Sequence, residues 1–168
     1  MSDPAVQELL DKEAIRQAVL RYCRGVDRAD EELLASAYHP DAVDHHGATP
    51  LEGAAIAPGI LVLVGKSTAS LHQITNQFIQ VQGPDVAAAE TYFTAWQGME
   101  FEGAERMLLA IGRYVDRFEK RDGEWRIADR LVIVEHTRLL PAEGVFPASQ
   151  PGLGRRDRDD PSYQVLGL

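Results

Sequence analysis

Two residues far apart in the chain, Asp27 and His72, have the types best suited to proton transfer. Asp27 follows the stretch RYCRGV at the end of an amphipathic helical pattern, where an anion is unfavourable because it faces the negative end of the helix dipole. A histidine partner would offset that cost. A carboxylate that accepts an imidazole N–H fixes the tautomer and raises the basicity of the other ring nitrogen. The residues alone leave one alternative open, an Asp27 solvated between Arg24 and Arg28.

The elements that carry Asp27 and His72 follow from the hydrophobic pattern. The first predicted helix begins near Pro4, and Asp27 borders its apolar stripe of Ile15, Val19, Tyr22 and Val26. His72 falls on a predicted strand over 70–82, where alternation gives one face to His72, Ile74, Asn76 and Phe78. The last predicted strand gives one face to Arg130, Val132, Val134 and His136. A helix packed across a curved sheet could bring Asp27 to His72, although on the residues alone a solvated Asp27 is the default.

Helical patterns come first along the chain, and long strand patterns follow. Short helices over 31–38 and 54–66 precede strands over 70–82, 86–101, 106–120 and 125–138. The pair Asp122-Gly123 is typical of a hairpin turn between the last two strands. This order predicts an α+β fold. We expect one domain over 1–140 and an extended C-terminal tail over 141–168 that packs on the domain or on a partner subunit.

Composition narrows the class of protein and its partners. The chain has 168 residues, 45% of them hydrophobic and 26% charged, which is typical of a single globular domain. The formal net charge of −9 disfavours nucleic-acid and anionic-membrane partners. The polar start MSDPAVQELLDKEAIRQ lacks the apolar core of a signal peptide, so we expect a cytoplasmic protein.

Motifs for cofactors and for covalent catalysis are missing from the sequence. There is no GxGxxG, Walker or GxSxG pattern, and Cys23, the single cysteine, lies in the helical stripe. The histidines of HPDAVDHHG do not form a metal set, because His45 and His46 point to opposite faces of a strand and His39 lies in the preceding turn. We therefore expect no cofactor and no metal, and the remaining chemistry is proton transfer.

Three blocks of the sequence carry a family resemblance: RYCRGVDRADEELLASAYHPDAVDHHG, SLHQITNQFIQV and GRYVDRFEKRDGEWRIADR. Together they resemble the SnoaL-like branch of the nuclear-transport-factor-2-like superfamily over residues 8–138. The resemblance implies a cone-shaped α+β barrel, in which three helices pack on a strongly curved antiparallel sheet that encloses an apolar pocket. It also implies a homodimer or a higher homo-oligomer.

The resemblance further implies roles for particular residues. The chain is similar to scytalone dehydratase, hexachlorocyclohexane dehydrochlorinase and bile-acid 7α-dehydratase, which pair an Asp at the end of the first helix with a His on the strand after the third helix. Those positions match Asp27 and His72. Tyr22 matches a dehydratase-like tyrosine, and Arg130 matches a dehydrochlorinase-like arginine. The residues expected to line the substrate pocket are Asp44, His46, Asn76, Phe78, Phe93 and His136.

The function that these expectations favour is a cofactor-independent lyase or isomerase, dehydratase- or dehydrohalogenase-like, acting on a small apolar cyclic or aromatic molecule. His72 is the expected base, Asp27 orients it, and Arg130 with Tyr22 stabilises charge on the leaving group or on an oxyanion. The alternative is a non-catalytic small-molecule-binding or assembly subunit, as in the small subunit of ring-hydroxylating dioxygenases. Members of that kind do not need an acid–histidine pair.

Overall fold

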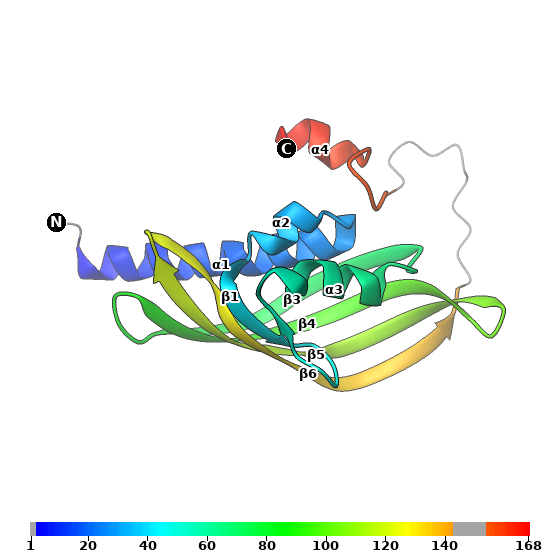
Figure 1. The fold of residues 1–168 in the computed structure, drawn as a ribbon, viewed down its shortest axis with the longest axis horizontal. Coiled ribbons are helices and arrows are strands. Elements are labelled where there is room, and N and C mark those ends of the chain that lie inside the picture. Colours follow the sequence, from blue (N-terminus) through cyan, green and yellow to red (C-terminus); the bar gives the residue numbers. More distant parts are fainter. Residues whose placement is uncertain (1–2, 143–153) are drawn as a thin grey trace.

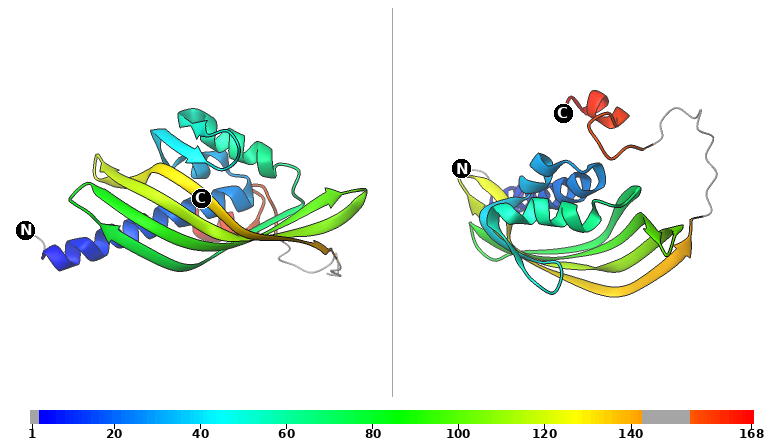
Figure 2. Two further views of the ribbon diagram at one scale, coloured as in Figure 1. Left: turned by 90° about the horizontal axis from the view of Figure 1, so that it is seen from below. Right: turned by 45° about the vertical axis from the view of Figure 1, so that its right-hand side comes forward.

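Three helices lie along the concave face of one curved sheet in a computed structural model that describes residues 3–142 and 154–168 (Figures 1 and 2). In chain order the elements are α1 (Pro4–Arg28), α2 (Glu31–Ala35), β1 (Tyr38–His45), β2 (Leu51–Glu52), a short 3₁₀ turn (Gly53–Ala55), α3 (Ile56–Val64), β3 (Ala69–Val81), β4 (Val86–Phe101), β5 (Ala104–Arg121), β6 (Glu124–Pro141) and α4 (Pro161–Leu166). The α+β prediction is therefore confirmed.

The six strands form one sheet in the order β2-β1-β6-β5-β4-β3. Strands β3 to β6 are antiparallel neighbours, as expected. Strand β1 departs from the expected antiparallel sheet, because it pairs in parallel with β6. The sheet curves round the helices like a cone but does not close, since β2 and β3 are its two free edges. The parallel pairing places Asp44 of β1 opposite Arg130 of β6.

Helix α1 begins and ends at residues suited to those positions. The side chain of Asp3 accepts the backbone N–H of Ala5 at 2.9 Å, and Pro4 occupies the first turn, where its missing N–H costs nothing. The helix stops at Ala29, which has a left-handed φ of 51°. Close to this end, a Cβ on Gly25 would lie 2.6 Å from the Leu34 backbone nitrogen, so only glycine lets α2 approach so closely.

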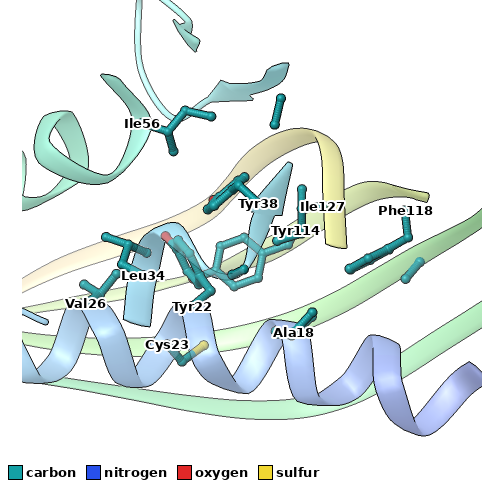
Figure 3. Packing of buried hydrophobic residues seen from close by; sticks show 14 of the residues in the cluster. Ala18, Tyr22, Cys23, Val26, Leu34, Tyr38, Ile56, Tyr114, Phe118 and Ile127 are labelled. Atoms are coloured by element: carbon teal, nitrogen blue, oxygen red, sulfur yellow. The ribbon is translucent and has the colours of Figure 1, made fainter. Parts of the chain in front are cut away.

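The hydrophobic core lies between α1 and the sheet (Figure 3). Its labelled members include Tyr22 and Val26 from α1, and Tyr114 and Phe118 from β5. Trp125 is also buried, and its indole N–H donates to Asp11 at 2.8 Å, in keeping with a structural role. Burial of the α1 stripe against this layer fixes the rotation of the helix, and so fixes the direction in which Asp27 points.

A β-bulge in β3 changes which residues face the helices. The register with β4 shifts between Ile74 and Gln77, so the alternation of side chains reverses at that point. His72 lies on the helix-facing side before the bulge, whereas Phe78 after it is 66% exposed. The prediction that residues 72, 74, 76 and 78 share one face is therefore wrong beyond residue 74, because one extra residue breaks the two-residue period.

The segment 154–168 packs against the end of α1 and against α2. Arg28 forms an ion pair with Asp160 at 2.8 Å, and the hydroxyl of Tyr163 donates to Asp30 at 2.7 Å. This part of the predicted tail is not extended throughout, since it includes α4. Residues 143–153 of the predicted tail lie outside the described residues, and the domain boundary at 140 stays a prediction. Within the described ranges, none of the helices combines the length and the apolar character that a membrane span requires.

Candidate active site

Asp27 and His72 meet where the last turn of α1 crosses the start of β3. Asp27 Oδ1 lies 2.6 Å from Nδ1 of His72, and Asp27 Oδ2 accepts the backbone N–H of the same residue at 2.9 Å. The hydroxyl of Ser70 donates to Oδ1 at 2.9 Å. The side chains of His72 and Asp27 are only 6% and 10% exposed. Three hydrogen bonds therefore hold one carboxylate and one imidazole in a single orientation.

Two sets of contacts keep Asp27 ionised in the last turn of α1, where the helix dipole disfavours a negative charge. Burial opposes ionisation, but the hydrogen bonds and charge of His72, together with the hydroxyl of Ser70, outweigh it and lower the pKa of Asp27. The guanidinium of Arg156 donates to the carbonyl oxygens of Val26 at 3.1 Å and Asp27 at 3.4 Å, which places a cation at the negative end of the helix. An ionised Asp27 can only accept, so Nδ1 of His72 carries the proton and Nε2 is basic.

A pocket of about 530 Å³ has His72 in its wall. Its other lining residues are His45, His46, Gly47, Phe93, Ala95, Gln97, Ala110, Tyr114, Leu131, Val132 and Val134. Nε2 of His72 has no hydrogen-bond partner among the described residues. The pocket thus combines apolar side chains with polar ones, among them an imidazole whose Nε2 is free, which is a setting for abstraction of a proton from carbon.

Aromatic rings pack near the imidazole of His72. The ring centroid of Tyr22 lies 6.3 Å from that of His72 and 5.4 Å from that of Tyr114. Tyr114 in turn stacks on Phe93 at 4.4 Å. Tyr22 is fully buried and is not among the residues that line the pocket, and burial raises the pKa of its hydroxyl far above the ordinary value. The structure places the ring of Tyr22 edge-on to that of His72.

Arg130 does not lie where the sequence prediction required it. Its guanidinium is fully buried, makes two 2.7 Å hydrogen bonds to Asp116, and sits over the rings of Tyr22 and Tyr114 at 4.2 and 4.1 Å. It is not among the residues that line the pocket. The structure therefore does not place Arg130 at the leaving group, because its donors already contact Asp116 and Tyr38.

Asp44 and His46 lie on the side of the pocket where β1 meets β6. Asp44 is fully buried and accepts the hydroxyl of Tyr38 at 2.5 Å, and its Oδ1 lies 3.4 Å from Nδ1 of His46. Both His46 and His45 line the pocket. The expectation that they point to opposite faces of a strand does not apply, because β1 ends at His45. Nε2 of His45 lies 3.9 Å from the exposed Asp129.

Four of the residues expected to bind substrate do not line this pocket, whereas His46 and Phe93 do. Asp44 is fully buried, so it contacts His46 and not the pocket itself. Asn76 and Phe78 are exposed because the bulge in β3 turns them away from the helices. His136 is exposed near a second register shift, between Ile111 and Gly112 of β5 in their pairing with β6. The three exposed residues share one cause, since a bulge interrupts the alternation of side chains along a strand.

The sequence analysis missed Ser70, Tyr114 and Asp116, which complete the surroundings of the site. A signal for two of them exists in the stretch GRYVDRF, where Tyr114 and Asp116 alternate in phase with the buried Phe118. An acid in the buried phase of a strand needs a buried cation, and Arg130 lies opposite Asp116 on β6. Ser70 carries no comparable signal.

The profile of the SnoaL-like domain matches residues 7–131 of this chain. The chain belongs to the SnoaL-like family. The matched range runs from α1 into β6, so this SnoaL-like domain contains both Asp27 and His72. No curated protein matches the sequence.

Solved structures similar to the SnoaL-like chain share its fold. A hexachlorocyclohexane dehydrochlorinase, LinA type 2, has a TM-score of 0.77 at 21% identity, over 87% of this chain and 99% of its own. LinA type 3 from Novosphingobium barchaimii LL02 has a TM-score of 0.75 at 21% identity, over 85% and 99%. A protein provisionally named scytalone dehydratase, from Novosphingobium aromaticivorans DSM 12444, has a TM-score of 0.70 at 19% identity, over 87% and 98%.

Proposed function

We propose that this SnoaL-like protein is a cofactor-independent lyase or isomerase in which His72 removes a proton from carbon. The proposal rests on one observation above all, the hydrogen bond between Asp27 and His72, whose imidazole lies in the wall of a partly apolar pocket. It is supported by the fold shared with a dehydrochlorinase, whose name describes elimination of hydrogen and chloride.

In the proposed reaction, Nε2 of His72 takes a proton from a carbon of the substrate. The electron pair of the broken C–H bond forms a carbon–carbon double bond, and the leaving group departs from the neighbouring carbon with its own electron pair. The imidazolium that forms is stabilised by Asp27, whose carboxylate remains ionised because its pKa is lowered. General base catalysis of this kind contributes about 10²–10⁴-fold to a rate.

The supporting residues have separate parts in this proposal. Tyr22 and Phe93 confine the imidazole, with ring centroids 6.3 and 6.5 Å from it. Arg130 acts through Tyr22 and Tyr114, against whose rings it packs, and is therefore a positioning residue. The side chains of Ala95, Ala110, Leu131 and Val134 would contact the apolar part of a substrate. A pocket of about 530 Å³ suits a small cyclic molecule.

A panel of small elimination substrates tests the proposal. It consists of hexachlorocyclohexane and of matched cyclohexanones that carry either chloride or hydroxyl on the β-carbon, and the product alkene is measured. We expect turnover of at least one compound, lost in His72→Ala while the melting temperature changes by only a few degrees. Turnover retained in His72→Ala would overturn the assignment of the base. Absence of turnover across the panel, with binding of the same compounds, would favour a non-catalytic binding protein instead.

A further inference from the structure

We propose that His46 is a second proton-transfer residue of this pocket and that it protonates a departing hydroxyl, so that the natural leaving group is an oxygen and not a halide. This inference rests on the proposed function of His72 as base. It concerns a different residue, on a different strand, and it makes a separate prediction about the leaving group.

The pair Asp44–His46 has unused hydrogen-bonding capacity inside the protein. Asp44 Oδ1 and His46 Nδ1 are both buried, and neither has a hydrogen-bond partner among the described residues. They lie 3.4 Å apart, close enough for an ion pair but not aligned as a hydrogen bond. The contact therefore repeats, at a longer distance, the acid–histidine pairing of Asp27 with His72.

Both histidines lie against the same tyrosine ring. The ring centroid of Tyr22 is 6.5 Å from that of His46 and 6.3 Å from that of His72. Both imidazoles also line the same pocket. Each has its Nδ1 toward a carboxylate, which leaves each Nε2 for the pocket. A small substrate can therefore contact one acid–histidine pair at its C–H bond and the other at its leaving group.

A chain of buried charges holds Asp44 in its ionised form. Arg130 of β6 lies opposite Asp44 of the neighbouring strand β1 and, on its other side, opposite Asp116 of β5. One guanidinium nitrogen of Arg130 is 3.4 Å from the hydroxyl of Tyr38, which donates to Asp44. Burial opposes ionisation, but the interaction with His46 and the positive charge of Arg130 outweigh it and lower the pKa of Asp44.

Exposure separates the roles of the two imidazoles. The side chain of His72 is 6% exposed and that of His46 is 23% exposed. His46 therefore keeps contact with water, which can return a proton to it after each turnover. We assign the role of base to the more enclosed His72 and the role of acid to His46.

The proposed step balances without a cofactor. Nε2 of His72 takes the proton from the carbon, the C–H electron pair forms the double bond, and the carbon–oxygen bond breaks with its electron pair remaining on oxygen. His46 delivers its proton from Nε2 to that oxygen, and water departs. His72 ends protonated and His46 neutral, and transfer of one proton through solvent restores both. Chloride leaves as a weak base and needs no proton, so His46 matters only for an oxygen leaving group.

The test compares β-hydroxycyclohexanone with β-chlorocyclohexanone, which give the same cyclohexenone product. Rates above background are measured for the natural chain and for His46→Asn, His72→Ala and Asp44→Asn, with thermal unfolding to check that each variant folds. We expect His46→Asn and Asp44→Asn to slow loss of water about 10²-fold or more beyond any effect that they have on loss of chloride. His72→Ala abolishes both reactions. A purely structural role for His46 would slow both in proportion.

Every other outcome overturns the inference. If the natural chain eliminates chloride but not water, or if His46→Asn slows both reactions equally, His46 is not the acid while the proposed function of His72 stands. If His46→Asn slows only loss of chloride, the assignment is reversed. If the natural chain eliminates neither leaving group but turns over hexachlorocyclohexane, the role of His46 fails while the proposed function stands. If it turns over none of these compounds, both fail.

Discussion

Asp27 binds His72 twice, through the imidazole at 2.6 Å and through the backbone N–H of the same residue at 2.9 Å. One carboxylate thereby fixes both the position of the strand and the orientation of the ring that it carries. The two contacts also select the tautomer, because an ionised carboxylate accepts the proton on Nδ1 and leaves Nε2 free. The predictions below follow from this pair and from the charges and rings packed around it.

Replacing Asp27 by Asn tests the control of the tautomer. We expect Asp27→Asn to reduce proton abstraction by about 10²-fold or more, because the amide can also donate and no longer stabilises the imidazolium. Nitrogen chemical shifts of His72, measured where the ring is neutral, should show the Nδ1-protonated form in the natural chain and a mixture in the variant. Ser70→Ala is the control, since it removes one hydrogen bond to Asp27 but keeps the carboxylate. An unchanged tautomer in Asp27→Asn would refute this account.

The lowered pKa of Asp27 predicts a dependence of stability on pH. Burial opposes ionisation, but the contacts with His72 and Ser70 lower the pKa in the folded state below the ordinary 3.8. Their stabilising contribution is therefore fully present above that value and is lost as the pH falls through the lower, folded-state pKa. We expect the difference in unfolding free energy between the natural chain and Asp27→Asn to narrow in that acidic range, as measured by urea unfolding. A difference in unfolding free energy that grows as the pH falls would contradict the lowered pKa of Asp27.

The buried ion pair of Arg130 and Asp116 predicts that replacing one partner destabilises the fold more than replacing both. We expect Arg130→Met to lower the unfolding free energy by about 3–5 kcal/mol, since it leaves Asp116 buried without its cation. The double variant Arg130→Met with Asp116→Leu should recover much of that loss, because no unpaired charge remains. Chemical denaturation of the three proteins measures the coupling. Additive losses would show that the pair is not the source of the effect.

Two phenylalanines test the reversal of faces in β3. Phe93 is buried, lines the pocket and stacks on Tyr114, so we expect Phe93→Ala to cost about 3–5 kcal/mol of stability and to impair turnover. Phe78 is exposed, so Phe78→Ala should change stability by no more than about 0.5 kcal/mol and leave turnover unchanged. Thermal unfolding and rates on the same substrate decide this. Comparable losses of stability and turnover in both variants would indicate that Phe78 also lines the pocket.

Two adjacent arginines test whether the segment 154–168 positions Asp27. Arg156 donates to the carbonyl oxygens of Val26 and Asp27 and to that of Ser67 at 2.8 Å. We expect Arg156→Ala to lower the melting temperature and to reduce kcat more than it changes KM, because the carboxylate of Asp27 loses its fixed place. The matched control is Arg155→Ala, since that side chain is half exposed and pairs only with surface acids. Equal effects of the two variants would argue against positioning by Arg156.

The sequence by itself determined those structural features that depend only on residues close together in the chain. The stripe of Ile15, Val19, Tyr22 and Val26 predicted the buried face of α1, and Asp122-Gly123 predicted the hairpin between β5 and β6. These patterns can be read locally because helical and strand periods, and the φ values that turns require, are set within a few residues. The family resemblance then added the pairing of Asp27 with His72, which no local pattern contains.

Only the tertiary structure decided which polar groups meet. The bulge after Ile74 removed Phe78 from the pocket, and the parallel pairing of β1 with β6 set Asp44 beside Arg130. Strand register and burial arise from the packing of the whole sheet against the helices, so an alternation read along one strand cannot reveal them. For the same reason Arg130, expected at the substrate, lies bound to Asp116 between two tyrosines, where its charge acts on the site through its neighbours.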